Sequence, residues 1–439
     1  MTTRFFAPTR REVLAGLAAS AAGAIAGGAA PSATARLALE ARPATLALKP
    51  TQPPAAIWEL AAASPAGAVR LRRGDRCEVA VQNNLPVPIA PAWHGLDGAS
   101  AAEPMLASSP IASGRTETSI LSMPHAGTLM ADLRLFEDVL KGLVRPLPVV
   151  VQETEPLAVD RDELFLVEDW RLDPDGAALR PGATGGEIAP IFTINGKIAP
   201  DFTLRRNERL RLRLINGCQR AVVAVKFEGV EVLVMALDGQ PAEPFTARNG
   251  ALVLAPGGRA DVFLDGSAAP ASAAPILLHD GNEARPVARL LTSAEPPLRT
   301  ARLPPPGPLP SNGLPAHLDL KGALRFDVAL GAAEAGWVRP PSFTASAAPV
   351  FRAKAGRTVV LAVKNPGPTT TVFHLHGHHF RLLDRLDDGW KPYWLDTLAI
   401  EPGQTQRIAF AATYPGRWLI ESVATEWAAP RLVRWYAVE

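Results

Sequence analysis

The chain has 439 residues, of which 47% are hydrophobic and 20% are charged, so it is long enough for several domains with buried cores. Lys and Arg number 45 against 43 Asp and Glu, a net charge of +2 that argues against nucleic-acid and anionic-membrane partners. The two cysteines, Cys77 and Cys218, are too few for a disulfide framework, a cysteine zinc site or an iron–sulfur cluster.

The first 35 residues have the pattern of an export signal. Arg10 and Arg11 precede an Ala- and Gly-rich run, and Ala33-Thr34-Ala35 fits a signal-peptidase cleavage pattern. Paired arginines favour the twin-arginine pathway, so we expect a periplasmic protein that is cleaved near Ala35. The alternative is an uncleaved membrane anchor. No later stretch reaches the roughly 18 apolar residues of a membrane span, so the mature chain is expected to lack a transmembrane segment.

Short segments with a period of two predict strands along the rest of the chain. Polar or small residues alternate with apolar ones over residues 76–82 and, more strictly, over residues 209–214. Such alternation is typical of a strand with one buried face. Residues 358–363 are continuously apolar, as in a strand buried on both faces. Because helical patterns are scarce, an all-β sandwich or barrel class is predicted.

Two breaks divide this strand-rich part into three blocks. The Pro-rich residues 302–310 predict an extended linker over residues 301–316, and a weaker break falls near Glu155-Pro156. Each block has a size suited to one β-sandwich. The expected domains cover residues 36–155, 156–300 and 317–439.

Each block also carries short motifs in a characteristic order. They include Trp93-His94-Gly95-Leu96 and Ala126-Gly127-Thr128, then Thr193-Ile194-Asn195-Gly196 and Ala255-Pro256-Gly257-Gly258-Arg259, and finally His374-Leu375-His376-Gly377-His378-His379 and Leu395-Asp396-Thr397. In order and spacing these motifs resemble those of the multicopper oxidase family. The resemblance implies three consecutive cupredoxin-like Greek-key β-sandwich domains. It also implies copper sites in the third domain and between the first and third domains.

The resemblance places the type 1 copper ligands of the family on residues that cannot replace them. The cysteine corresponds to Ser422, the two histidines correspond to Thr371 and Trp427, and the axial methionine corresponds to Leu432. A serine hydroxyl cannot form the copper–sulfur bond of a blue copper site. Cys77 and Cys218 lie in the first and second blocks, so neither is expected to substitute.

The trinuclear copper cluster of the family needs four His-x-His pairs, and the resemblance leaves only three of those histidines here. They are His94, His374 and His376, whereas Asp132, Arg134 and Glu421 stand at replaced positions. Reduction of O₂ to water needs the type 1 copper and the complete cluster, so neither oxidase activity nor a cofactor is expected. The alternative is one Cu or Zn ion held by the three histidines with Asp132 or Glu421.

Arg134 leads to a second prediction for the position of the trinuclear cluster. A guanidinium between Asp132 and Glu421 would replace the charge of the metals by a fixed cation, so an inter-domain ion pair is predicted. The remaining histidines are not expected to be ligands. Packing or surface roles are predicted for His378 and His379, and a turn or surface position is predicted for His125.

The family includes copper-free members that are exported by the twin-arginine pathway and support bacterial cell division. This chain resembles them in its signal, its three blocks and its replaced ligands. We therefore expect a non-catalytic, monomeric structural or interaction protein with protein partners in the cell envelope, acting at the division site. The alternative is a metal-binding protein, or an oxidoreductase of altered mechanism, that uses His94, His374 and His376.

Overall fold

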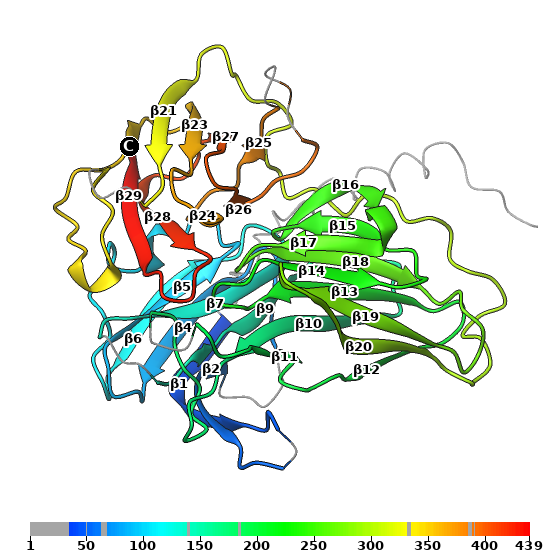
Figure 1. Cartoon of the computed structure of the whole chain (residues 1–439). Coiled ribbons are helices and arrows are strands. Elements are labelled where there is room, and N and C mark those ends of the chain that lie inside the picture. Colours follow the sequence, from blue (N-terminus) through cyan, green and yellow to red (C-terminus); the bar gives the residue numbers. More distant parts are fainter. Residues whose placement is uncertain are drawn as a thin grey trace, which may run out of the picture. The chain divides into compact units, whose positions relative to one another are not determined.

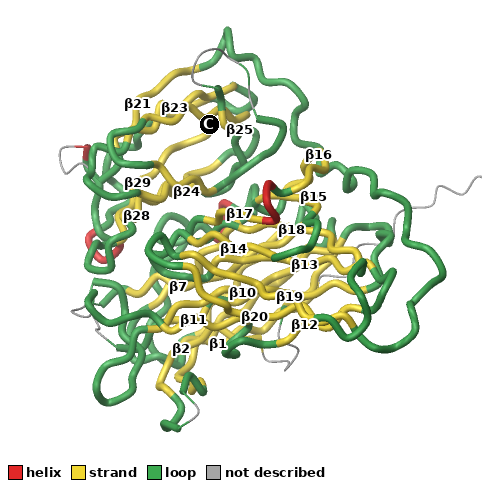
Figure 2. The backbone as a smooth tube through the Cα atoms, turned by 45° about the vertical axis from the view of Figure 1, so that its right-hand side comes forward, coloured by secondary structure: helices red, strands yellow, loops and turns green. Residues whose placement is uncertain are grey.

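The computed structural model describes residues 35–49, 51–62, 68–137, 141–182, 186–331, 335–384, 389 and 391–439. All of the expected export signal except Ala35 lies outside these residues. Strands and loops dominate (Figure 1 and Figure 2), and the helical elements are short 3-10 turns such as η1 (Ser100–Ala102), η2 (Arg248–Gly250) and η4 (Pro340–Ser342). In the described part, no helix is long and apolar enough to cross a membrane.

The first block forms two sheets, ordered β6-β4-β1-β2-β8 and β3-β9-β7-β5, which share one hydrophobic core. The alternation predicted for residues 76–82 is present in β4, whose Cys77, Val79 and Val81 are buried in that core. The strands of the block are β1 (Ala35–Leu46), β2 (Ala55–Ala62), β3 (Val69–Arg72), β4 (Arg76–Asn83), β5 (Ile89–His94), β6 (Thr116–Ser122), β7 (Gly127–Leu135), β8 (Val144–Arg145) and β9 (Leu147–Gln152).

The second block forms the sheets β11-β10-β13-β18-β15-β16 and β12-β20-β19-β14-β17, again around one core. Its strands are β10 (Arg161–Trp170), β11 (Ile191–Ile194), β12 (Asp201–Leu204), β13 (Arg209–Asn216), β14 (Val223–Phe227), β15 (Leu233–Leu237), β16 (Gln240–Thr246), β17 (Ala251–Leu254), β18 (Arg259–Asp265), β19 (Ala273–His279) and β20 (Ala284–Thr292).

Strand β13 is buried on both faces, and the prediction of one exposed face is therefore wrong. Its leucines lie in the core of the second block, while its arginines form ion pairs on the other face. Arg213 pairs with Asp162 at 2.6 Å and donates to the Thr128 hydroxyl on β7 at 2.8 Å. The first block thus covers the polar face of β13, and acidic and hydroxyl groups replace water as partners of the arginines.

The third block forms the sheets β21-β23-β27-β25 and β22-β29-β28-β24-β26 around a third core. The apolar segment predicted at residues 358–363 lies in β23, where nearly every side chain is buried. The strands are β21 (Leu324–Ala329), β22 (Arg352–Ala353), β23 (Thr358–Lys364), β24 (Thr371–Leu375), β25 (Arg381–Leu382), β26 (Thr397–Ile400), β27 (Thr405–Ala411), β28 (Gly416–Ala424) and β29 (Arg431–Val438).

Every sheet takes its strands from one block only, so the prediction of an all-β fold with three consecutive sandwiches is confirmed. Residues 302–315 contain no strand or helix, and within this stretch Asn312 hydrogen bonds to the backbone of Ala126 and to Gln240. The blocks also touch directly, as where Leu106 packs with Leu419 and Trp435. These contacts bring strands of the first and third blocks together around buried polar residues.

Candidate functional site

The residues singled out between the first and third blocks lie on four strands, except His376, which follows the last residue of β24 (Thr371–Leu375). His94 ends β5, and Asp132 and Arg134 lie on the paired strand β7. In the third block, His374 on β24 is directly opposite Glu421 on β28. Side chains two residues apart on a strand share a face, so Asp132 and Arg134 point the same way.

Arg134 joins the two blocks through hydrogen bonds to both neighbouring carboxylates. Its Nε and Nη2 donate to the two carboxylate oxygens of Glu421 at 2.8 Å and 3.0 Å, and Nη1 donates to Asp132 at 2.7 Å. The exposed fractions of the Arg134 and Glu421 side chains are 2% and 0%. A two-pronged guanidinium–carboxylate pair of this kind is strong and directional.

Glu421 has a second cationic partner in Arg431, whose Nη1 also donates to it. Burial alone would raise the pKa of Glu421, but Arg134 and Arg431 outweigh burial and hold the pKa well below its ordinary value. Glu421 is therefore ionised at neutral pH. Its charge is balanced by two guanidinium groups in fixed positions.

His94 and His374 stack face to face, with ring centroids 4.0 Å apart and planes inclined by 9°. Burial lowers the pKa of both rings well below the ordinary value, and His376 and Arg134 add to this as nearby cations. Both rings are therefore neutral. Because lone pairs lie in the ring plane, two parallel stacked imidazoles do not direct their nitrogens at one shared ion.

His376 has the opposite charge state. Its Nδ1 lies 2.7 Å from a carboxylate oxygen of Glu103, and its Nε2 lies 3.5 Å from Glu421. Burial acts to lower the pKa of His376, but the two carboxylates raise it to about 9. An imidazolium between two glutamates must lose a proton before it can ligate a metal.

Three buried ring nitrogens in this region have no hydrogen-bond partner among the described residues, namely Nδ1 of His94, Nδ1 of His374 and Nε2 of His376. Ligand atoms of His374, His376 and Glu421 lie within 4.8 Å of one another and could hold one ion. His94 and Asp132 do not belong to this group. The structure therefore brings together only part of the predicted His₃-carboxylate set.

A cavity of about 20 Å³ adjoins these side chains, which is roughly the room needed for one water. His94, His374 and Glu421 line it, together with Cys218. Cys218 was not expected near the copper positions, because it lies in the second block. Burial raises the pKa of its thiol well above the ordinary value, and Asp169 and Glu168 raise it further, so the thiol is protonated and a poor ligand.

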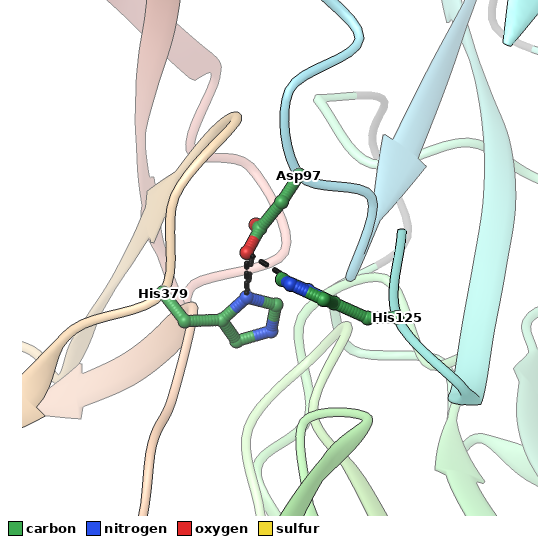
Figure 3. Close-up of side chains that lie close together, drawn as sticks. All are labelled: Asp97, His125 and His379. Atoms are coloured by element: carbon green, nitrogen blue, oxygen red, sulfur yellow. Dashed lines mark hydrogen bonds and ion pairs between the residues drawn. The ribbon is translucent and has the colours of Figure 1, made fainter. Parts of the chain in front are cut away.

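A second buried cluster, shown in Figure 3, joins Asp97 to His125 and His379. Nδ1 of His379 donates to the Asp97 carboxylate at 2.9 Å, and its Nε2 donates to the carbonyl of Asp238 at 2.9 Å. Nδ1 of His125 lies 3.2 Å from Asp97 and 3.0 Å from the amide nitrogen of Gln240. The cluster thus draws on all three blocks.

The positions of His125 and His379 correct the sequence prediction in part. His125 is buried rather than in an exposed turn, and His379 is a buried ion-pair partner rather than a packing or surface residue. Burial acts to lower the pKa of His379, but Asp97 and Asp396 raise it to about 9. His378 is buried in the third block, where its Nδ1 hydrogen bonds with the Tyr436 hydroxyl at 2.8 Å.

Asp396 links the two clusters. It accepts two hydrogen bonds from Arg259 of the second block, at 2.9 Å and 2.8 Å. The same carboxylate lies 3.9 Å from Nε2 of His374 and 4.0 Å from Nε2 of His379. The buried polar residues between the blocks therefore form one continuous network from Arg134 to Asp97.

Comparison with known proteins identifies the family. Three family models described as multicopper oxidase match residues 44–131, 164–273 and 317–439, one in each block. The chain belongs to the multicopper oxidase family. Multicopper oxidase MmcO of Mycobacterium tuberculosis (strain ATCC 25618 / H37Rv) is 27% identical over 415 residues, covering 81% of this chain and 78% of MmcO. Laccase-1 of Thanatephorus cucumeris is 28% identical over 205 residues, covering 39% of this chain and 35% of that protein.

Solved multicopper oxidases have the same fold. The multi-copper oxidase from Pseudomonas Thermotolerans matches with a TM-score of 0.79 at 24% identity, covering 93% of this chain and 100% of that one. Lac15 from a marine microbial metagenome matches with a TM-score of 0.75 at 25% identity, covering 92% and 100%. These multicopper oxidases share the three-sandwich architecture described above.

The donors at the positions assigned to the type 1 site do not fit copper. Thr371 is engaged through its hydroxyl, which donates to Asn365 at 3.2 Å. Ser422 is opposite Leu432 across β28 and β29, and Leu432 packs against the third core. The Trp427 ring packs under the Arg171 guanidinium at 4.6 Å. Hydroxyl, indole and hydrocarbon groups do not match the thiolate and imidazoles that such a site requires.

The donors at the trinuclear position do not fit three coppers either. The guanidinium groups of Arg134 and Arg431 already donate hydrogen bonds to the Glu421 carboxylate. The adjoining cavity of about 20 Å³ has room for roughly one water molecule. Sequence reasoning did not single out Glu103 or Arg431. Neither belongs to a motif with ligand spacing, so no local signal marked them.

Proposed function

We propose that this multicopper oxidase-like protein is not an oxidase and acts instead as a structural or interaction protein of the periplasm. The observation that carries the proposal is Arg134, which is buried and hydrogen bonded to Asp132 and Glu421 across the two blocks. A fixed guanidinium supplies positive charge where the resemblance places metal ions. It also repels any further cation, which raises the free-energy cost of binding copper there.

One observation favours a second candidate function, residual binding of a single Cu or Zn ion. His374, His376 and Glu421 present ligand atoms within 4.8 Å of one another, and two of their ring nitrogens lack hydrogen-bond partners. Two imidazoles and a carboxylate are an acceptable donor set for either ion. Binding would require release of the His376 proton and of at least one guanidinium contact to Glu421.

Metal analysis separates these two candidates. We expect the purified protein, incubated with excess Cu²⁺ or Zn²⁺ and then desalted, to retain far less than one ion per chain. We also expect no intense blue absorption and no O₂ consumption with a phenolic dye. The matched control is His374→Ala combined with His376→Ala. Near-stoichiometric metal that this double variant abolishes would contradict the first candidate and establish the second.

We further propose that the protein acts at the bacterial division site, by analogy with copper-free members of the family. A fluorescent fusion that folds before export is expected to reach the periplasm and concentrate at the septum. The control is Arg10→Lys with Arg11→Lys, which should retain the fusion in the cytoplasm by removing the twin-arginine signal. An even periplasmic distribution throughout the cell cycle would contradict the role in division.

A further inference from the structure

A pocket of about 460 Å³, lined in part by Arg134, lies where the three blocks meet. Its lining comes from β7, from residues 180–182 and 219–220 of the second block, and from residues 339–341 and 430–431 of the third. Asp132 and Arg431 line both this pocket and the small cavity beside His374. The volume falls in the range of small-molecule sites.

The lining of this pocket is strongly cationic. Its arginines are Arg134, Arg180, Arg220, Arg339 and Arg431. The acidic side chains of the lining are Asp132 and Glu137, and Glu421 adjoins it as the partner of Arg134 and Arg431. Among the described residues of this lining, arginines outnumber carboxylates. Arg180 and Arg339 have partners of their own, so Arg220 is the arginine that matters most for binding an anion.

Arg220 is a buried member of this set that is held by backbone carbonyls. Its exposed fraction is 6%, and its guanidinium donates only to the carbonyls of Gln219 at 2.7 Å and Ala429 at 3.0 Å. Within the described part of the chain, its Nε has no hydrogen-bond partner and no carboxylate lies within ion-pair distance of it, while the Asp169 carboxylate offsets its charge in part from farther away. Burial, together with Arg431 and Arg134, lowers the pKa of Arg220 to about 9. Arg220 is a buried cation with unused donors.

We propose that this pocket binds a small organic oxyanion carrying two or more negative charges, such as a phosphate monoester or a di- or tricarboxylate. Guanidinium groups match both oxyanions through paired N–H donors. A buried cation without a carboxylate at ion-pair distance is costly, and a bound anion would lower that cost at Arg220. Leu135, Val144 and Pro340 supply apolar walls that suit the organic part of the ligand.

Anion binding in this pocket does not depend on whether the protein binds a metal ion. It would give the proposed interaction protein a small-molecule ligand. Because the lining comes from all three blocks, a bound anion would contact all three at once. A ligand that binds only the folded state raises the unfolding temperature with its concentration. Occupancy of the pocket would therefore also be visible as a rise in that temperature.

Isothermal titration calorimetry with phenyl phosphate and with citrate tests the proposal and distinguishes the two ligand chemistries. We expect at least one probe to bind with one site per chain, and Arg220→Gln to weaken that binding by about tenfold or more. Arg180→Gln, at the half-buried rim, is a second variant in case the first is poorly folded. The matched control is Arg289→Gln, which removes the same charge from an exposed pair with Asp201.

Two results would overturn the proposal. One is failure of both probes to bind the folded wild-type protein at millimolar concentration. The other is equal weakening of binding by Arg220→Gln and Arg289→Gln, which would reveal general attraction to a charged surface. Neither result bears on the metal content of the protein, so the failure of this inference and that of the proposed function are distinguishable.

Discussion

Replacing Arg134 with leucine is expected to lower the free energy of unfolding by about 3–5 kcal/mol, the scale for removing one partner of a buried ion pair. The change leaves Asp132 without its guanidinium partner and leaves Glu421 with Arg431 and His376 only. Both carboxylates are buried, so water cannot fully replace the lost donors. Equilibrium unfolding in urea, followed by circular dichroism, measures the effect.

Two further variants of the protein serve as a control and as a test of rescue. Arg289→Leu breaks an exposed pair with Asp201 and is expected to change stability little, because solvent screens that pair. Arg134→Leu combined with Asp132→Asn should recover part of the loss, since the carboxylate left without its guanidinium partner is then neutral. Unchanged stability of Arg134→Leu would show that the three-residue network does not hold the first and third blocks together.

Replacing Asp97 with asparagine is expected to cost a similar amount, about 3–5 kcal/mol, but only in a defined pH range. His379 is a buried imidazolium whose pKa is raised to about 9 by Asp97 and Asp396, against an ordinary value of 6.5. Its stabilising effect is complete below about pH 6.5 and is lost as the pH rises through about 9. The pKa of Asp97 is lowered, so its contribution is lost as the pH falls below about 4.

The stability difference between wild type and Asp97→Asn should therefore be largest from about pH 4 to 6.5 and shrink as the pH approaches 9. Urea unfolding at several pH values measures it. The imidazolium of His376 beside Glu103 is present in both proteins, so its titration cancels in the comparison. Asp201→Asn serves as the exposed control. A difference that stays constant with pH would mean that Asp97 acts by packing and not by charge.

Local patterns were sufficient for the fold class but not for the faces of individual strands. The alternation at residues 76–82 predicted β4 and its buried face, since the outer face of that strand stays open to water. The same pattern at residues 209–214 was misleading for β13. There the first block covers the arginine face, and a packing partner distant in the sequence leaves no trace in local periodicity.

For the candidate site too, local spacing predicted some features and distant contacts decided others. The two-residue spacing of Asp132 and Arg134 on one strand predicts that these side chains share a face. His376 could be singled out from its motif, but its charge state could not, because Glu103 reaches it from a turn in another block. Asp97 and His379 meet only because the first and third blocks dock. Charge states follow from neighbours, and these neighbours are distant in the sequence.

The sequence by itself determined the all-β class and the family resemblance, and it predicted that other side chains stand at most of the family's copper-ligand positions. These properties depend on side-chain chemistry and on spacing within single strands. Only the tertiary structure decided that Arg134 bridges two buried carboxylates, that His94 stacks on His374, and that Arg220 faces other arginines in a pocket. Those contacts arise where three sandwiches pack, and burial there turns ordinary charged residues into a coupled network.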